Sequence, residues 1–122
     1  VAAGKSMGGR IASQMAADSL ISVKALVFLG YPLHPPGNKE QLRDAHLYRI
    51  TAPMLFFAGT RDTLCDLDLL KPVVSRLKAP TYLEVIEGGD HSFVLPKSFK
   101  SSEEAVYEKI LKRTVAWLKQ QV

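Results

Sequence analysis

The sequence predicts an α/β fold, in which a parallel sheet is connected by crossover helices. Short, continuous apolar runs alternate with amphipathic stretches along the 122 residues, and the runs end at or near glycines. Apolar residues make up 47% of the chain and charged residues 23%. These fractions are typical of a globular domain, and they exclude disordered, collagen-like and coiled-coil classes.

The first half of the chain gives two strands and one long helix. Val1–Ala3 reads as the tail of a strand, and Met7–Leu20 has apolar residues every fourth position, as a helix requires. Ala25–Leu29 is a continuous apolar run, which is typical of a strand covered on both faces. Tyr31–Lys39 is rich in proline and glycine and predicts a loop, and a short helix is expected near Glu40–Tyr48.

The second half repeats the alternation. Met54–Ala58 and Tyr82–Ile86 read as strands, and a helix from Asp68 to about Leu77 lies between them, with Asp68 as its cap and Pro72 near its first turn. A capping box of Ser101 and Glu104 predicts the start of the last helix. The apolar face expected for that helix consists of Val106, Ile110, Leu111, Trp117 and Leu118.

Charge and cysteine content exclude several function classes. The net charge of +4 comes from scattered basic residues, so no nucleic-acid partner is expected. The longest apolar runs fall far short of the roughly 20 residues of a membrane span, so no membrane partner is expected either. Cys65 is the single cysteine; it cannot form an internal disulfide, is expected to be buried, and favours a cytoplasmic protein. No Cys/His cluster has metal-ligand spacing, and no cofactor is implied.

The segment Gly4-Lys5-Ser6-Met7-Gly8 lies between a predicted strand and a predicted helix. It fits the G-x-S-x-G nucleophile elbow, a strained turn that exposes a serine hydroxyl. Gly4 and Gly8 are expected to be required because a side chain at either position would collide in so sharp a turn. The backbone N–H of Met7, at the helix start, would then donate to a developing oxyanion. The alternative interpretation is a tight glycine-rich turn with a capping serine.

A serine nucleophile needs a base and an orienting acid, which this kind of sheet supplies in the chain order Ser, Asp, His. His91 directly follows the last predicted strand, whereas His34 and His46 precede every plausible acid. Asp62 follows the preceding strand and is the best candidate for the acid. Of its rivals, Asp66 and Asp68 lie at a helix start, and Asp90 would diverge from its neighbour His91.

The Pro-rich loop Tyr31-Pro32-Leu33-His34-Pro35-Pro36-Gly37 is predicted to face the same rim as the serine. Tyr31 and His34 are therefore candidates for lining a substrate site. A structural role that holds the loop geometry is the other interpretation.

Together these motifs resemble the α/β-hydrolase superfamily, and more narrowly the small predicted hydrolases related to dienelactone hydrolases. The resemblance covers essentially the whole chain and implies Ser6 as nucleophile, Asp62 as acid and His91 as base. It also implies that residues 1–122 form the C-terminal part of the fold, about strands five to eight, and the chain opens on Val1 without an initiator Met. The N-terminal strands and the loop with the second oxyanion N–H are then expected to be missing, and the open strand edge to promote self-association.

The function implied is a serine hydrolase for an ester, thioester or lactone of a small acyl group. One alternative is a module that kept the fold, lost activity and binds a protein partner. A less favoured alternative is a phosphate-binding loop, because Gly4-Lys5-Ser6 matches the end of the G-x-x-x-x-G-K-[ST] motif.

Overall fold

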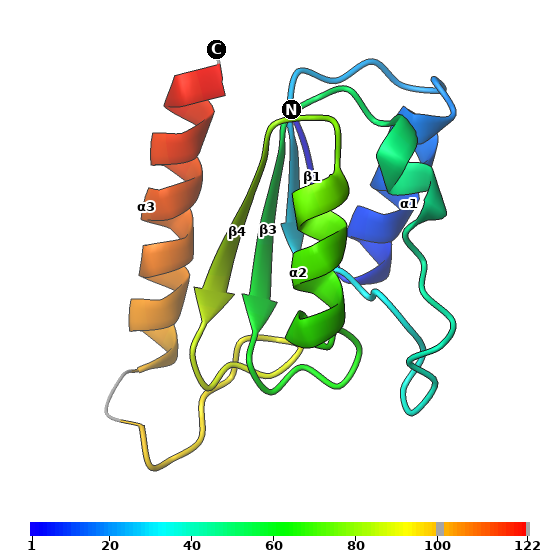
Figure 1. Cartoon of the computed structure of the whole chain (residues 1–122). Coiled ribbons are helices and arrows are strands. Elements are labelled where there is room, and N and C mark those ends of the chain that lie inside the picture. The colour runs from blue at the N-terminus through cyan, green and yellow to red at the C-terminus, as the bar shows by residue number, and fades with distance from the viewer. Residues whose placement is uncertain (100–101, 122) are drawn as a thin grey trace.

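The computed structural model describes residues 1–99 and 102–121. Its elements in chain order are β1 (Ala2–Lys5), α1 (Met7–Ala17), β2 (Leu26–Leu29), the 3₁₀ helix η1 (Ala45–Arg49), β3 (Met54–Gly59), α2 (Leu67–Arg76), β4 (Thr81–Ile86) and α3 (Glu103–Gln121). The four strands form one parallel sheet in the order β1-β2-β3-β4, which confirms the predicted fold class. The arrowheads of β3 and β4 point to the edge of the sheet where the loops after these strands gather (Figure 1), and the parallel pairing places the ends of β1 and β2 at the same edge.

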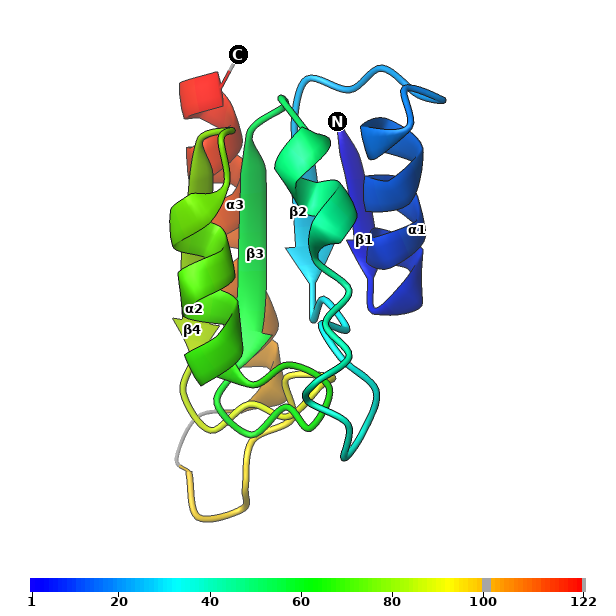
Figure 2. The same cartoon turned by 45° about the vertical axis from the view of Figure 1, so that its right-hand side comes forward.

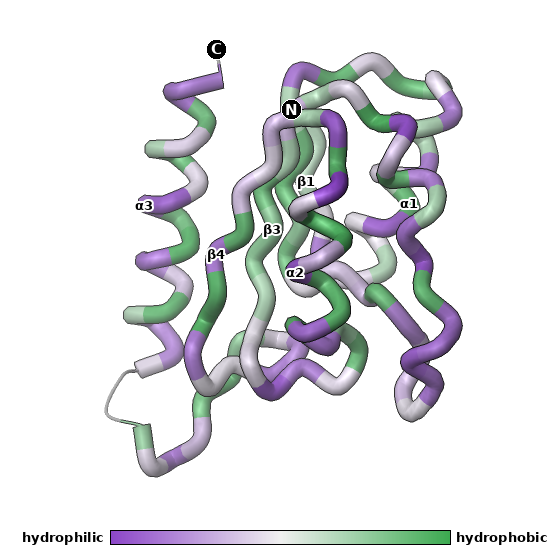
Figure 3. The backbone as a smooth tube through the Cα atoms, viewed as in Figure 1, coloured by the Kyte–Doolittle hydropathy of each residue, from purple (hydrophilic) through white to green (hydrophobic). Residues whose placement is uncertain are grey.

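Two apolar layers explain why the strand runs are continuous. Side chains alternate between the faces of a strand, so Leu26 and Phe28 enter one core while Val27 enters the other. The helices α1 and α2 cover the first face and α3 covers the second (Figure 2). The tube through the strands is mostly green, whereas the loop before η1 is mostly purple, so hydropathy follows burial (Figure 3).

The first helix, α1, ends earlier than predicted and exposes much of its apolar stripe. Ser19 adopts φ 59°, and the N–H of Leu20 donates to the Met15 carbonyl, which terminates the helix after Ala17 instead of Leu20. Met7 and Ile11 are 60% and 50% exposed. The buried residues of α1 are Gly9 and Ser13, and the small side chains of Ala12 and Ala16 pack against the core.

The capping prediction for α2 was wrong by two residues. Asp66 is the cap, and its carboxylate accepts the N–H of Asp68 at 2.9 Å. Because the helix begins at Leu67, Pro72 lies in the second turn and not near the first. The short helix expected near 40–48 is confined to η1, a single 3₁₀ segment.

The last helix packs on the sheet through Val106, Ile110 and Trp117, whereas Leu111 is 64% exposed, contrary to its predicted place on the apolar face. Ser101, predicted as the cap, lies outside the described residues. The neighbouring Ser102 accepts the N–H of Ala105 at 3.1 Å. No helix within the described part of the chain is long and apolar enough to cross a membrane.

Candidate active site

Ser6 occupies the single-residue turn between β1 and α1. Its backbone has φ 53° and ψ −123°, a combination that is strained for any residue with a side chain. The turn is possible because Gly4 and Gly9 touch: a Cβ on Gly4 would lie 2.3 Å from the Gly9 nitrogen. The strain holds the Ser6 hydroxyl at the edge of the sheet where the strands end.

The predicted steric role of Gly8 was wrong. A Cβ built on Gly8 would meet no described atom within 4 Å, whereas one on Gly9 would lie 2.8 Å from the Gly4 carbonyl oxygen. The close approach therefore falls one residue later, because the helix turns Gly9 toward the strand and Gly8 away from it. Gly9 is the glycine that the turn requires.

Ser6, His91 and Asp62 form one continuous chain of hydrogen bonds. The Ser6 Oγ and the His91 Nε2 are 2.6 Å apart, and the His91 Nδ1 lies 2.7 Å from the Asp62 Oδ2. The carboxylate can only accept, so Nδ1 carries the hydrogen and donates it to Asp62. The lone pair of Nε2 then accepts the hydroxyl hydrogen of Ser6, which is the arrangement of a serine prepared for attack.

Asp62 is held by two separate contacts. Its second oxygen, Oδ1, accepts the N–H of Leu64 at 2.7 Å, and the side chain has no exposed surface. One carboxylate oxygen is thus fixed by the backbone while the other faces His91. The rivals Asp66 and Asp90 are occupied elsewhere, since Asp66 caps α2 and Asp90 accepts the N–H groups of Ser92 and Val94.

Two glycines, whose role was not foreseen from the sequence, make room for the loop that carries His91. A Cβ on Gly59 would lie 2.1 Å from the Gly89 carbonyl oxygen, and one on Gly30 would lie 2.8 Å from the His91 carbonyl oxygen. Gly30 also has φ 73°, a left-handed conformation that favours glycine. One feature of the sequence could have identified them: Gly30 directly follows β2 and Gly59 is the last residue of β3, at the edge of the sheet where the site lies.

Further hydrogen bonds join the acid loop to the base loop. The Arg61 N–H donates to the Gly89 carbonyl at 2.8 Å, and the Gly88 N–H donates to the Thr60 hydroxyl at 2.8 Å. Asp62 and His91 are therefore carried by a single bonded unit.

The N–H of Met7 has no hydrogen-bond acceptor within residues 1–99 and 102–121. It is the first N–H of α1 and follows Ser6 directly. A free N–H at a helix N-terminus favours a negatively charged oxygen. The geometry is thus compatible with the predicted donation to an oxyanion.

Tyr31 and His34 both make structural contacts. Tyr31 is buried, and its hydroxyl donates to the Arg43 carbonyl at 2.6 Å. His34 is also buried, and its Nε2 accepts the N–H of Asp66 at 3.1 Å. These contacts support the structural interpretation of the Pro-rich loop. His34 also lines a cavity with Asp62, so a place beside the substrate stays a prediction for it.

A second serine–histidine pair lies deeper in the molecule. The Ser13 Oγ and the His46 Nε2 are 2.7 Å apart, and Ser13 has no exposed surface. His46 has no hydrogen bond to a carboxylate among the described residues. The Ser13–His46 pair therefore lacks the carboxylate partner that the Ser6–His91 pair has, and its buried serine offers a substrate no access.

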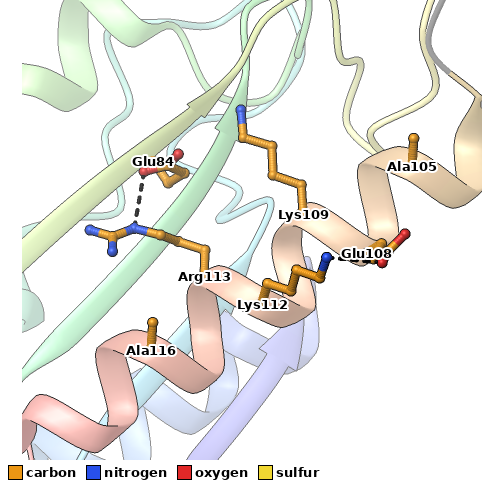
Figure 4. Close-up of a pocket in the computed structure, with 7 residues that line it drawn as sticks. All are labelled: Glu84, Ala105, Glu108, Lys109, Lys112, Arg113 and Ala116. Atoms are coloured by element: carbon orange, nitrogen blue, oxygen red, sulfur yellow. Dashed lines mark ion pairs between the residues drawn. The ribbon is translucent and has the colours of Figure 1, made fainter.

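Two cavities lie away from the serine. One of about 640 Å³ is lined by Asp62 and His34 but by neither Ser6 nor His91. The other, of about 490 Å³, is a groove between β4 and α3 (Figure 4). Four of the charged side chains that line it form two ion pairs, Arg113 with Glu84 at 3.4 Å and Lys112 with Glu108 at 3.1 Å. Neither cavity contains the hydrogen-bonded serine.

The phosphate-loop alternative is incompatible with the backbone. Gly4 and Lys5 belong to β1 and pair with Phe28 and Leu29 of β2. A phosphate cradle needs several loop residues between the strand and the lysine. Here the strand continues through the lysine, so no cradle can form.

Comparison with known proteins agrees with the geometry. A family model for the alpha/beta hydrolase domain matches residues 1–119. Solved structures with a similar fold include dienelactone hydrolase from Anabaena variabilis ATCC 29413, with a TM-score of 0.67 and 21% identity over 98% of this chain and 48% of that chain. Monoacylglycerol lipase from Paleococcus ferrophilus has a TM-score of 0.74 and 14% identity over 98% of this chain and 68% of that one. Thermogutta terrifontis esterase 2 has a TM-score of 0.72 and 17% identity over 97% of this chain and 54% of that one. At these identities the structures show a shared fold, and the chain spans about half the length of the first of them.

Proposed function

The chain belongs to the alpha/beta hydrolase domain family, and on that premise we propose that it is a serine hydrolase with Ser6 as nucleophile, His91 as base and Asp62 as acid. The observation that carries the proposal is the continuous chain of hydrogen bonds from Asp62 through His91 to Ser6, with contacts of 2.7 Å and 2.6 Å. These residues follow three different strands, and they meet because parallel strands end at one edge of the sheet.

In the proposed reaction, the Ser6 Oγ attacks the carbonyl carbon of an acyl substrate while the His91 Nε2 takes the hydroxyl proton. His91 then returns that proton to the leaving oxygen or sulfur, which departs as an alcohol or thiol. Asp62 keeps Nδ1 as the donor and stabilises the imidazolium during both steps. Water attacks the acyl-enzyme with the help of His91, and the acid is released as Ser6 is restored.

The oxyanion of the tetrahedral intermediate accepts a hydrogen bond from Met7 N–H in this proposal. In such sites a second donor comes from a loop after an earlier strand, and losing one donor lowers the rate by about 10²–10³. We therefore propose slow turnover for residues 1–122 alone. The full gene product that contains residues 1–122 is accordingly the protein to assay.

The substrate class we propose is an ester, thioester or lactone of a small acyl group. The argument rests on the segment between β2 and η1. Its first part packs on the sheet, where Tyr31, Leu33 and His34 are buried, and its exposed part, residues 36–41, is too short for a large lid. A short, closely packed segment favours small or exposed acyl groups over long chains. A cytoplasmic location, favoured by the single Cys65, is part of the same proposal.

The test is the intact mass of the full gene product after treatment with a fluorophosphonate, with Ser6→Ala and Ser75→Ala measured alongside. Ser75 lies on α2, exposed and far along the chain from the site, so it is the matched serine control. We expect one adduct in the parent and in Ser75→Ala and none in Ser6→Ala. Hydrolysis of short p-nitrophenyl esters should follow the same pattern. Absence of an adduct on the folded parent would contradict the proposal and favour the non-catalytic interaction module.

A further inference from the structure

A buried polar cluster lies beneath the nucleophile helix. It consists of Ser13 on α1, Tyr31 just after β2 and His46 on η1, and all three side chains are buried. The His46 Nε2 is the shared member, 2.7 Å from the Ser13 Oγ and 3.3 Å from the Tyr31 hydroxyl. Three segments that are separate in sequence therefore meet at one nitrogen atom.

The hydroxyl hydrogens determine the direction of each bond. Ser13 donates to the Arg10 carbonyl at 2.6 Å, and Tyr31 donates to the Arg43 carbonyl at 2.6 Å. Each hydroxyl has one hydrogen, so both oxygens are left as acceptors toward His46. The Nε2 of His46 consequently carries the hydrogen and donates it, more closely to Ser13 than to Tyr31.

His46 is the neutral form of the ring in this cluster. Burial lowers its pKa, and the nearby Arg49 and Arg10 lower it further. A neutral ring with its hydrogen on Nε2 satisfies the cluster without placing a charge in the core. The Nε2 of His46 is therefore a hydrogen-bond donor within the cluster at neutral pH.

The two partners of His46 support the two ends of the Ser6–His91 contact. Ser13 lies in the second turn of α1, the helix that directly follows Ser6. Tyr31 follows Gly30, and a Cβ on Gly30 would lie 2.8 Å from the His91 carbonyl oxygen and 3.5 Å from its Nδ1. One partner thus belongs to the helix that carries the nucleophile, and the other adjoins the residue against which the base packs.

We propose that His46 is a positioning residue, which fixes α1 relative to the end of β2 and so sets the distance between the Ser6 hydroxyl and the His91 ring. This inference rests on the proposed serine-hydrolase function. His46 touches no reacting atom; it acts through Ser13 and Tyr31. Without its N–H, α1 is still held at its start by the contact between Gly4 and Gly9 and at its end by the ion pair between Asp18 and Arg49 of η1, so the loss falls on the middle of the helix.

The experiment measures the rate of fluorophosphonate labelling of Ser6 per folded molecule, in the full gene product, for His46→Leu, His46→Gln and Ser13→Ala. Leu removes the N–H donor, and Gln restores an amide N–H at a similar reach. Thr114 on α3 supplies the control, because its hydroxyl donates to the Ile110 carbonyl at 2.7 Å and α3 covers the opposite face of the sheet from α1. Thr114→Val is therefore measured in parallel, and thermal unfolding reports the folded fraction of each variant.

We expect His46→Leu and Ser13→Ala each to slow labelling by about three- to tenfold, consistent with the effect of displacements well below 1 Å. The double variant His46→Leu/Ser13→Ala should be labelled no more slowly than the slower of the two single variants, because each single substitution already removes the bond between His46 and Ser13. His46→Gln should recover most of the rate. Thr114→Val should leave the rate per folded molecule unchanged, whatever its effect on the melting temperature.

Labelling of folded His46→Leu and Ser13→Ala at the parental rate would overturn the positioning role, and so would a failure of Gln to rescue. If His46→Leu does not fold, Ser13→Ala alone decides, because alanine is a good helix former and fills the space of serine almost completely. A parent that is not labelled at all would instead contradict the serine-hydrolase function itself. The two failures are therefore distinguishable.

Discussion

Substituting Gly59 with alanine should displace the base without altering any of the three residues in the hydrogen-bonded chain. Gly59 ends β3, and a Cβ there would lie 2.1 Å from the Gly89 carbonyl oxygen and 2.8 Å from the Asp90 carbonyl oxygen. An unstrained carbon–oxygen contact needs roughly 3.3 Å, so the loop before His91 must retreat by about 1.2 Å. The obstruction is backbone, which has no rotamer to relieve it.

The size of the effect follows from that displacement. A misplacement of about 1 Å in a catalytic group lowers a rate by about 100-fold, which corresponds to roughly 2.7 kcal/mol in the barrier. Overpacking should also lower the free energy of unfolding by about 1–3 kcal/mol. Alanine reduces the entropy of the unfolded chain and recovers about 0.4–1 kcal/mol of that loss.

The assay is the fluorophosphonate labelling rate of Ser6 with urea unfolding of the same samples, and Gly89→Ala is the control. Gly89 lies in the same loop, but a Cβ there meets the Ile86 Cγ2 at 3.0 Å, and a side-chain methyl can move by a few tenths of an ångström. We expect Gly89→Ala to slow labelling by no more than about threefold. Equal rates for the parent and Gly59→Ala would refute the reasoning that glycine at this position determines where His91 lies.

Three further predictions concern the surface and the titratable groups. Ile11→Lys, on the exposed stripe of α1, should reduce self-association in sedimentation experiments and change the free energy of unfolding by no more than about 0.5 kcal/mol; unchanged association would mean that another surface is responsible. Asp66→Ala should destabilise the chain to urea by about 1 kcal/mol through loss of the α2 cap, and Asp66→Asn by less, because asparagine also caps. The pKa of Asp66 is lowered by the side chain of Lys39 and by the Asp68 N–H. The stabilisation from the Asp66 charge is therefore present above the ordinary carboxyl pKa range and is lost on acidification. The parent should lose more stability than Asp66→Asn as the pH falls, and parallel curves of stability against pH would contradict this. Burial, Asp62 and Asp66 raise the pKa of the Cys65 thiol to about 12, so at pH 8 only about one molecule in ten thousand carries the thiolate, and iodoacetamide should modify the folded chain far more slowly than the urea-unfolded chain.

The fold and the central hydrogen-bonded chain were accessible from the sequence because both depend on local patterns. A strand covered on both faces has to be apolar throughout, so β2 and β3 are visible as uninterrupted runs. The parallel arrangement then places the residue that follows each strand at a common edge. That common edge, together with the G-x-S-x-G motif, the chain order Ser, Asp, His and the family resemblance, grouped Ser6, Asp62 and His91.

The predictions that failed depend on contacts between distant segments. His34 has the sequence surroundings of a surface histidine, among prolines. Its burial was not foreseen because its hydrogen-bond partner, the N–H of Asp66, lies 32 residues away in the sequence. Gly8 and Gly9 are indistinguishable in composition, and only the phase of α1 decides which of them meets the strand. Leu111 fits a helical apolar period but is exposed, because the face that α3 buries against the sheet is narrower than the apolar period suggests.

The order of the strands has a consequence for how the molecule becomes reactive during folding. Each strand pairs with the one before it in the chain, from β1 to β4. The loop that carries His91 packs against Gly30 and Gly59, so it reaches this position only where β2 and β3 are in place. A chain that has collapsed without seating this loop has Ser6 but no base beside it. On the proposed function, serine reactivity therefore reports that the His91 loop is docked on the sheet, and a chain without that docking does not react.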